Sequence, residues 1–252
     1  MRLLIDIGNT AIKWAIESDG KLQPMNRFSY TADKIQKQLQ SNFSQIDFYK
    51  ITKILVSNVA GSKIKVTITD WAKETIQLSP QFAQVTNRAN GLVNAYTHPE
   101  LLGIDRWLAL IAASHSYKAP FCVIDCGTAV TIDGVDQNKH FIGGAILPGL
   151  ALQRQSLNQS TNAIDQVFTE KIENVFAKNT KQGVLAGTTF AITALIENMS
   201  AKLRIQTEKS VTCILTGGDA EVIEKYLSLT AELEPNLVLQ GLHLWGKENV
   251  LD

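Results

Sequence analysis

A segment near the start of the chain returns near its middle. Residues 4–10 read Leu-Ile-Asp-Ile-Gly-Asn-Thr, and residues 123–129 read Val-Ile-Asp-Cys-Gly-Thr-Ala. Aligned without a gap on Asp6 and Asp125, each copy continues as a second apolar stretch, so each predicts a β-hairpin with an acidic, glycine-containing turn. Two such hairpins half a chain apart predict a duplicated fold, whose turns would clamp a phosphate group between two lobes.

Composition limits the class of protein and its partners. The 252 residues are 45% hydrophobic and 19% charged, which is typical of a soluble globular protein with one large or two modest domains. Lys and Arg together number 24, and so do Asp and Glu. Because the net charge is zero, we expect neither nucleic acid nor a membrane as a partner. Any bound anion must be held by local geometry.

The N-terminal segment and the cysteines indicate a cytoplasmic protein. The first apolar run ends at Asp6, unlike a signal peptide, and no uninterrupted apolar stretch approaches the ~20 residues that span a bilayer. Cys122 and Cys126 would lie about 13 Å apart on one strand, too far for a disulfide. With Cys213 in another apolar run, we expect buried thiols and no zinc site.

Hydrophobic patterning predicts the elements of the first half. Residues 2–7, 11–16 and 22–28 are expected to form a three-strand antiparallel meander. After the meander we expect, in order, a helix capped by Thr31 and ending near residue 39, a buried strand at 54–56, a helix at 62–76, a polar loop at 87–99 and a helix from residue 104.

The second half repeats this order. A hairpin begins near residue 121, and a third strand runs from residue 140 to the Pro148-Gly149 pair. The later elements expected are an exposed helix and loop at 153–165, a long helix at 184–203, a strand at 211–215, a glycine turn at 216–219 that begins a helix, a strand at 237–239 and a last helix.

The first acidic turn carries groups that suit a phosphate. The chain has neither a P-loop nor a Rossmann glycine motif, so another device is needed. Gly8 would let backbone amides approach a phosphate, Asn9 and Thr10 add donors, and Asp6 can hold Mg²⁺ directly or through water. Lys13 can add positive charge from the next strand. The alternative is a hairpin in which the polar residues only cap the turn.

The second acidic turn would meet the same phosphates from the other side. It offers Asp125, the hydroxyls of Thr128 and Thr131, and a following run at residues 143–149 that contains Gly-Gly and Pro-Gly pairs. Taken alone, that run is typical of a sharp chain reversal. Because it follows an acidic hairpin, we expect it to line a bound ligand.

Asp105 and Arg106 stand side by side where a helix is expected to begin. Adjacent residues diverge by about 100° on a helix, so the two side chains face different partners. A carboxylate is favoured at a helix N-terminus, where it could accept a hydroxyl proton during phosphoryl transfer. The guanidinium could bind a carboxylate or a phosphate. The alternative is a capped helix with a surface ion pair.

In this order and spacing, the motifs resemble those of the type III pantothenate kinases, which belong to the acetate and sugar kinase superfamily. The resemblance spans nearly the whole chain. The motifs that carry it are Asp6-x-Gly-Asn-Thr, Gly103-x-Asp-Arg, Asp125-x-Gly-Thr-Ala-x-Thr, Gly143-Gly-x-Ile-x-Pro-Gly and Thr216-Gly-Gly-Asp.

The resemblance implies an α/β fold of two duplicated actin-like, or ribonuclease H-like, lobes. Each lobe has helices and a mixed sheet with a three-strand antiparallel meander, and a cleft separates the lobes. Residues 1–118 would form the lobe with the first phosphate hairpin and the pantothenate motif. Residues 119–252 would form the lobe with the second phosphate hairpin and an adenosine-side glycine turn.

The resemblance also implies a function. The enzyme would use ATP to phosphorylate pantothenate to 4′-phosphopantothenate, the first step of coenzyme A biosynthesis, with Mg²⁺ and a monovalent cation, K⁺ or NH₄⁺, as a homodimer. Asp105 would be the catalytic base, Asp6 would lie near Mg²⁺, and Asp125 would be the ligand of the monovalent cation.

The remaining implied roles are binding roles. The ATP-binding residues would be Asp6, Ile7, Gly8, Asn9, Thr10, Ala11, Ile12, Lys13 and Thr128. The pantothenate-binding residues would be Tyr96, Gly103, Ile104, Asp105, Arg106 and Thr180, the last reaching the substrate of the neighbouring subunit. Without the resemblance, Tyr96 would be read as packing and Thr180 as an ordinary N-cap.

Two other functions remain open from the sequence. One is a kinase for a sugar or a small carboxylic acid, since the superfamily shares the phosphate hairpins but not the substrate pocket. The other is a non-catalytic accessory regulator, as some relatives were first described as accessory factors for transcription. The neutral charge and the absence of a basic DNA-reading helix disfavour direct DNA binding.

Overall fold

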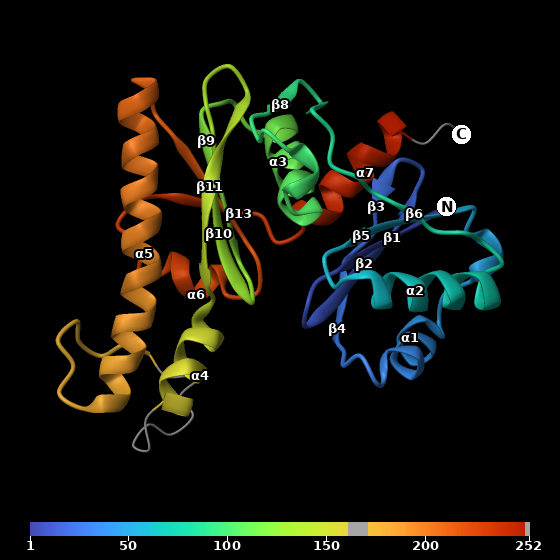
Figure 1. The fold of residues 1–252 in the computed structure, drawn as a ribbon, viewed down its shortest axis with the longest axis horizontal. Coiled ribbons are helices and arrows are strands. Elements are labelled where there is room, and N and C mark those ends of the chain that lie inside the picture. Colours follow the sequence, from blue (N-terminus) through green and yellow to red (C-terminus); the bar gives the residue numbers. More distant parts are fainter. Residues whose placement is uncertain (161–170, 250–252) are drawn as a thin grey trace. The chain divides into compact units, whose positions relative to one another are not determined.

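The computed structural model describes residues 1–160 and 171–249 as a mixed α/β protein (Figure 1). Its contacts divide the chain into two compact units. Unit 1 comprises Met1–Ser116 and Asn236–Asp252, and unit 2 comprises Tyr117–Pro235. The boundary predicted from the sequence lies between residues 118 and 119 and leaves the C-terminal helix in the second lobe, whereas the contacts group that helix with unit 1.

Unit 1 is built on a mixed sheet that contains the expected meander. The order is β3-β2-β1-β5-β6, with β4 also paired to β2. The β1, β2, β3 and β4 pairings are antiparallel, while β5 lies parallel to β1 and β6 parallel to β5. The strands are β1 Arg2–Ile7, β2 Ala11–Ser18, β3 Lys21–Leu22, β4 Asn26–Ser29, β5 Lys53–Asn58 and β6 Gln81–Phe82.

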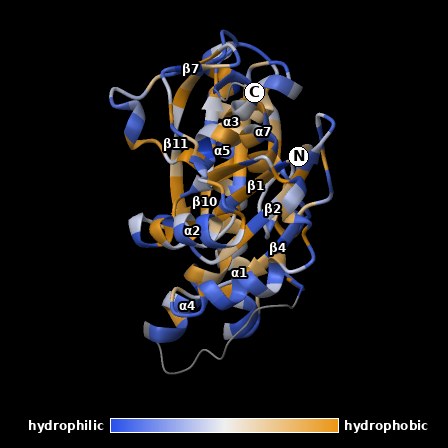
Figure 2. Cartoon of the chain, turned by 90° about the vertical axis from the view of Figure 1, so that its right-hand side faces the viewer, coloured by the Kyte–Doolittle hydropathy of each residue, from blue (hydrophilic) through white to orange (hydrophobic). Residues whose placement is uncertain are grey.

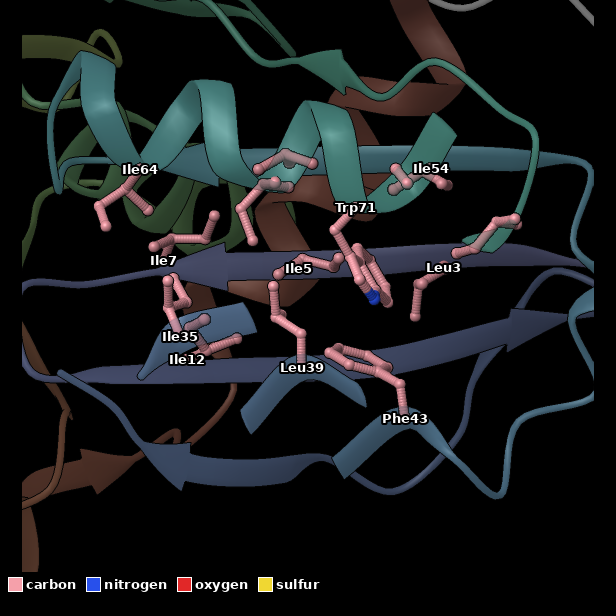
Figure 3. Close-up of a cluster of buried hydrophobic side chains, with 14 of the residues drawn as sticks. Leu3, Ile5, Ile7, Ile12, Ile35, Leu39, Phe43, Ile54, Ile64 and Trp71 are labelled. Carbon is pink, nitrogen blue, oxygen red and sulfur yellow. The ribbon is translucent and has the colours of Figure 1, made fainter. Parts of the chain in front are cut away.

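One face of this sheet carries the main core of unit 1. Side chains alternate across a strand, so Leu3, Ile5 and Ile7 of β1 point to the same side. They pack in a cluster with helices α1 (Ile35–Phe43) and α2 (Ser62–Thr75). Figure 3 shows Leu39 and Phe43 of α1 and Ile64 and Trp71 of α2 among these strand residues.

Helices α3 (Ile104–Ser116) and α7 (Leu237–Asn249) pack against each other in unit 1 and contact its strands. Their approach is close, because a Cβ at Gly241 would lie 1.9 Å from the carbonyl oxygen of Leu108. The expected strand at residues 237–239 is therefore wrong: these residues are the first turn of α7. Val238, Leu242 and Trp245 are buried at helical spacing, so the apolar residues at 237–239 belong to the buried face of a helix.

Unit 2 contains the second meander. Its strands follow the order β13-β12-β9-β10-β11, antiparallel from β9 to β11 and parallel from β9 to β13. They are β9 Phe121–Cys126, β10 Ala129–Val135, β11 His140–Pro148, β12 Thr212–Thr216 and β13 Ala231–Leu233. Strand β13 was not predicted from the sequence; it is a three-residue edge strand with mostly exposed side chains. The three cysteines are buried free thiols, as expected.

The helices of unit 2 are α4 (Leu150–Ser160), α5 (Thr180–Thr207) and α6 (Ala220–Glu224). Buried residues of α5, including Ile192, Ile196 and Leu203, pack with strand residues in one core cluster. By length and composition α5 could also cross a membrane, although 44% of its apolar window is buried inside the structure. In Figure 2, α4 is coloured largely hydrophilic, in keeping with the exposed helix expected there; residues 161–165 of that expectation lie outside the described residues.

Two local expectations in unit 1 are wrong. Thr31 does not cap α1, which begins at Ile35 after a turn in which the Lys34 amide donates to the Thr31 carbonyl. The expected loop at 87–99 contains a short hairpin of β7 (Arg88–Ala89) and β8 (Leu92–Asn94) and a 3-10 turn at Pro99–Leu101. Asn90 and Gly91 both have positive φ, as a two-residue hairpin turn requires.

The two acidic hairpins differ in length by one residue. Asp6 pairs with Lys13, seven residues later, but Asp125 pairs with Thr131, six residues later. The ungapped alignment of the repeat therefore needs a one-residue gap in the turn. With the gap, the buried Ile12 corresponds to the buried Val130, and Lys13 corresponds to Thr131.

Candidate active site

In unit 1, Asp6 lies near the carboxyl end of β1 and is 6% exposed. Its cross-strand neighbours are Lys13 on β2 and Ser57 on β5, whose side chains lie on the same face of the sheet. The Ser57 hydroxyl is fully buried and has no hydrogen-bond partner among the described residues. Ser57 was not predicted from the sequence, because only the register of β5 against β1 places it beside Asp6.

Tyr30 holds the turn after Asp6 through a hydrogen bond to its backbone. The Gly8 amide donates to the Ala11 carbonyl at 3.1 Å, which closes the turn. The Tyr30 hydroxyl donates to the Gly8 carbonyl at 2.8 Å, and burial raises the pKa of this phenol. Asn9 and Thr10 are exposed at the tip. Tyr30 is a second residue that sequence reasoning missed, since it lies beyond β4, far from the motif in the chain.

Asp105 lies in the first turn of α3, as expected. Its Oδ1 accepts a hydrogen bond of 2.8 Å from the Arg106 backbone amide. Burial raises the pKa of this carboxyl, while the Arg106 amide, the Arg106 guanidinium and the Lys13 ammonium act in the opposite direction. Because Lys13 affects the pKa of Asp105, the Asp105 carboxyl lies near β2, the strand on which Lys13 pairs with Asp6.

Gly103 leaves room for this arrangement of Asp105. A Cβ at residue 103 would lie 2.7 Å from Asp105 Oδ1, so with any other residue there the Asp105 carboxyl would have to move. The Gly103 carbonyl also accepts from the Trp107 amide at 3.1 Å, which makes it part of the first turn of α3. The glycine of the motif therefore permits the orientation of the acid two residues later.

The structure brings Arg106 and Tyr96 together. Arg106 is 9% exposed, and its Nη1 donates to the Tyr96 hydroxyl at 3.4 Å. The Tyr96 backbone is held in turn by its amide, which donates to Asn94 Oδ1 at 3.0 Å. A guanidinium beside a phenol presents donors suited to a carboxylate. Two of the residues expected to bind substrate thus share one location, ten residues apart in sequence.

In unit 2, Asp125 lies near the end of β9, and two glycines from elsewhere in the chain approach its turn. Gly217 has a φ of +96°, and a Cβ there would lie 2.5 Å from both Asp125 Oδ1 and the Cys126 carbonyl oxygen. A Cβ at Gly149 would lie 2.1 Å from the Gly127 carbonyl oxygen. The glycine runs at 143–149 and 216–219 therefore both line the second acidic turn through their backbones.

Thr128 and Thr180 are the other predicted residues of unit 2. The Thr128 carbonyl accepts from the Gly149 amide at 2.9 Å, so the turn is joined to the residue before α4. Thr180 is the first residue of α5, whose N-cap is Asn179; the Asn179 side chain accepts from the Gln182 amide. Thr180 lines a groove of about 470 Å³ between α4 and α5. Its alternative reading as an N-cap is therefore wrong.

The predicted residues thus form two groups. Unit 1 holds Asp6 to Lys13, Tyr96 and the segment from Gly103 to Arg106, and unit 2 holds Asp125, Thr128 and Thr180. Within each unit, residues far apart in sequence lie around one acidic turn or one helix terminus. Their chemical roles stay predictions.

These features define an α/β protein of the actin-like fold, with two acidic β-hairpins that each begin a three-strand meander. Solved structures share this fold. A Campylobacter jejuni protein assigned to the Baf family of transcriptional activators has a TM-score of 0.61 at 24% identity, covering 98% of each chain. A Listeria monocytogenes protein assigned as an N-acetylmannosamine kinase has a TM-score of 0.55 at 14% identity, covering 98% of this chain and 99% of the other.

The family is shown by sequence. A family model described as type III pantothenate kinase matches residues 2–202. A type III pantothenate kinase of Nitrosococcus oceani is 34% identical, over 98% of this chain and 94% of its own. That of Azoarcus sp. is 33% identical, over 100% of this chain and 93% of its own. The chain belongs to the type III pantothenate kinase family, enzymes that phosphorylate pantothenate in coenzyme A biosynthesis, and the expected fold and family are confirmed.

Proposed function

We propose that this chain transfers the γ-phosphoryl group of ATP to the primary hydroxyl of pantothenate, with Asp105 as the proton acceptor. The observation that carries the proposal is the Asp105 carboxyl in the first turn of α3, with Oδ1 fixed at 2.8 Å from the Arg106 amide. A fixed carboxylate suits phosphoryl transfer, because its loose transition state depends on positioning the acceptor more than on basic strength.

The environment of Asp105 favours proton transfer at neutral pH. Burial raises the pKa of its carboxyl, which makes the carboxylate a better proton acceptor than an exposed aspartate. The positive end of the α3 dipole and the nearby Lys13 ammonium keep the charged form accessible. A partly buried carboxylate at this position can therefore accept the hydroxyl proton and return it to water after the transfer.

Arg106 and Tyr96 are proposed to bind the pantothenate carboxylate. Their side chains meet at 3.4 Å, and Arg106 has further N–H donors in its planar fork. Gly103 and Ile104 form the start of the same helix, so the backbone at residues 103–106 would border the substrate. This arrangement would fix the distance between the acid end of pantothenate and the hydroxyl near Asp105.

The first turn, from Asp6 to Lys13, and Thr128 are proposed to bind ATP. A bound Mg²⁺ would neutralise phosphate charge, and oxygen donors are the ligands it prefers. Asp6 and the Ser57 hydroxyl supply such oxygens side by side on β1 and β5. No cluster of three or more acidic, His or Cys side chains suited to a metal occurs in the described ranges. That fits Mg²⁺, which is commonly held by one or two carboxylates and substrate phosphates.

Asp125 is proposed as the ligand of a monovalent cation, K⁺ or NH₄⁺. Its Oδ1 and the Cys126 carbonyl oxygen both lie close to Gly217, so two oxygens converge there. Replacing K⁺ by Na⁺ in the assay should lower the turnover rate several-fold. An unchanged rate would contradict the assignment of the cation to Asp125.

The assembly and location are also proposals. Thr180 lies at the start of α5 beside an open groove, a position from which it could contact a substrate held by a second copy of the chain. We propose a homodimer on this basis and on the family. The relatives are soluble metabolic enzymes, which supports a cytoplasmic location.

The role of Asp105 is tested by Asp105→Asn. The asparagine can still accept the Arg106 amide bond, so we expect a folded protein whose kcat is about 10²–10⁴-fold lower, the usual size of a general-base contribution. Asp19→Asn is the matched control, since Asp19 is an exposed turn residue with positive φ that asparagine tolerates. Turnover is measured as pantothenate-dependent ADP release. Near-normal turnover of Asp105→Asn would contradict the role of Asp105 as the catalytic base.

A further inference from the structure

Two of the three cysteines meet in the sheet of unit 2. Cys122 on β9 and Cys213 on β12 are register partners in a parallel pairing. Register partners on adjacent strands point to the same face of a sheet, and both thiols belong to the core cluster that includes Ile192 and Ile196 of α5. Cys122 and Cys126 are too far apart along one strand for a disulfide, but the pairing of β9 with β12 brings a different pair of thiols together.

The geometry of this pair suits a disulfide. Neighbouring strands lie about 4.8 Å apart, and the Cα atoms of a disulfide are usually about 4.4–6.8 Å apart. The two thiols already share a hydrogen bond. Cys122 is 3% exposed and Cys213 is 2% exposed, which favours a bond between them over a mixed disulfide with a larger thiol. Neither strand has to shift its register for the bond to form.

Cys213 is the thiol expected to lose its proton first. The hydrogen bond from the Cys122 thiol lowers the pKa of Cys213, burial opposes this effect, and the Ser200 hydroxyl of α5 adds to the lowering. The neutral Cys213 thiol donates to the Ser200 hydroxyl at 3.3 Å, and a hydroxyl can equally donate to a thiolate. The same thiol contact raises the pKa of Cys122, and burial adds to this rise. Because the thiolate is the nucleophilic form of cysteine, Cys213 is the first sulfur to react.

We infer that Cys122 and Cys213 form a modification site, at which a hydroperoxide converts the two thiols into an intramolecular disulfide. The Cys213 thiolate attacks one oxygen of hydrogen peroxide, the O–O bond breaks, and a sulfenic acid and hydroxide form. The Cys122 sulfur then attacks the Cys213 sulfur, the S–O bond breaks, and the hydroxyl group leaves with the Cys122 proton as water. The two sulfurs lose two electrons in total, and one peroxide, with the two thiol protons, becomes two molecules of water.

The position of the thiol pair connects it to the second acidic turn. Cys122 lies three residues before Asp125 on β9, and Cys213 lies three residues before Thr216 on β12. Asp125 and Thr216 are themselves register partners, and the next residue, Gly217, approaches the Asp125 carboxyl. A disulfide would fix the spacing of the two strands that present this turn, so we expect it to lower turnover. This effect rests on the proposed role of Asp125, whereas formation of the disulfide does not.

The test treats the folded wild-type protein with hydrogen peroxide, alkylates the remaining thiols and maps unreduced peptides by mass spectrometry. We expect a peptide pair that joins Cys122 to Cys213, with the loss of two hydrogen atoms, and its disappearance after treatment with dithiothreitol. Cys126→Ala is the matched control, because Cys126 is a buried cysteine of the same strand whose partner on β10 is Val130. This variant should form the disulfide as the wild type does, and Cys213→Ala should form none.

A disulfide that is absent after peroxide treatment, or that forms only after unfolding in urea, would overturn the inference. Turnover of the oxidised wild type should fall several-fold and return after reduction, while peroxide should leave the turnover of Cys213→Ala unchanged. Unchanged turnover of protein that carries the disulfide, or an equal fall in Cys213→Ala, would overturn the connection to the acidic turn. If Cys213→Ala does not fold, Cys213→Ser replaces it. Pantothenate-dependent ADP release by the reduced wild type tests the proposed function separately.

Discussion

Asp105 serves two opposed requirements. As a proton acceptor it needs a raised pKa, and burial supplies this, but burial of a charged carboxylate also destabilises the folded state. Gly103 removes the steric obstacle to its orientation, and the Arg106 amide fixes Oδ1. Such a residue is expected to reduce stability in exchange for activity, which is common at active sites.

This conflict predicts the stability of Asp105→Asn. Because the folded-state pKa lies above the unfolded value, ionised Asp105 opposes folding above that pKa, and the effect vanishes once both states are protonated at low pH. Near neutral pH the variant should be as stable as wild type or more stable, by up to about 2 kcal/mol. Urea unfolding at several pH values should show the difference shrinking as the pH falls. A variant that is less stable at neutral pH would contradict the cause given for the pKa shift.

At the scale of elements, the sequence predicted the parts that periodicity controls. The two meanders, α2, α3 and α5 occur where alternation or helical spacing indicated them. The start of α7 was mistaken for a strand because Leu237, Val238 and Leu239 are all apolar, and three such residues cannot distinguish the two periods. The edge strand β13 was missed because only its pairing with β12, not an apolar pattern, defines it.

The site residues that stand in local motifs were predictable from the sequence, and those placed by tertiary contacts were not. The acidic turns and Asp105 stand in recognisable motifs, but Tyr30 and Ser57 do not. Tyr30 contacts Gly8 from beyond β4, and Ser57 lies beside Asp6 through a parallel pairing. Such contacts depend on tertiary structure, which a single sequence does not display.

Two adjacent glycines in the turn after β12 give a matched pair of variants. Gly217→Ala would place a Cβ 2.5 Å from Asp125 Oδ1 and the Cys126 backbone, at a φ of +96°. We expect a loss of unfolding free energy of about 2–4 kcal/mol, since overpacking and backbone strain add. Gly218→Ala meets nothing within 4 Å and should change stability by less than about 1 kcal/mol. Equal effects of the two variants in urea unfolding would contradict the close approach of Gly217 to the second acidic turn.

At the scale of the whole molecule, the chain contains a duplicated meander, but its helices and strands are not divided evenly between the two units. Each unit contains a meander with an acidic turn, yet the last helix of the chain belongs to unit 1. Since the net charge is zero, recognition of two anionic substrates must come from local features. Those features are the glycine turns, the first turn of α3 and the buried Arg106.

The most direct test of the central claim is ADP release by the wild-type protein with MgATP in K⁺ buffer, with and without pantothenate. We expect release to depend on pantothenate and to yield one 4′-phosphopantothenate for each ADP. Sugars and small carboxylic acids should not replace pantothenate. ADP release that is independent of pantothenate, or that only a sugar stimulates, would contradict the assignment, and no release under any condition would favour a non-catalytic role.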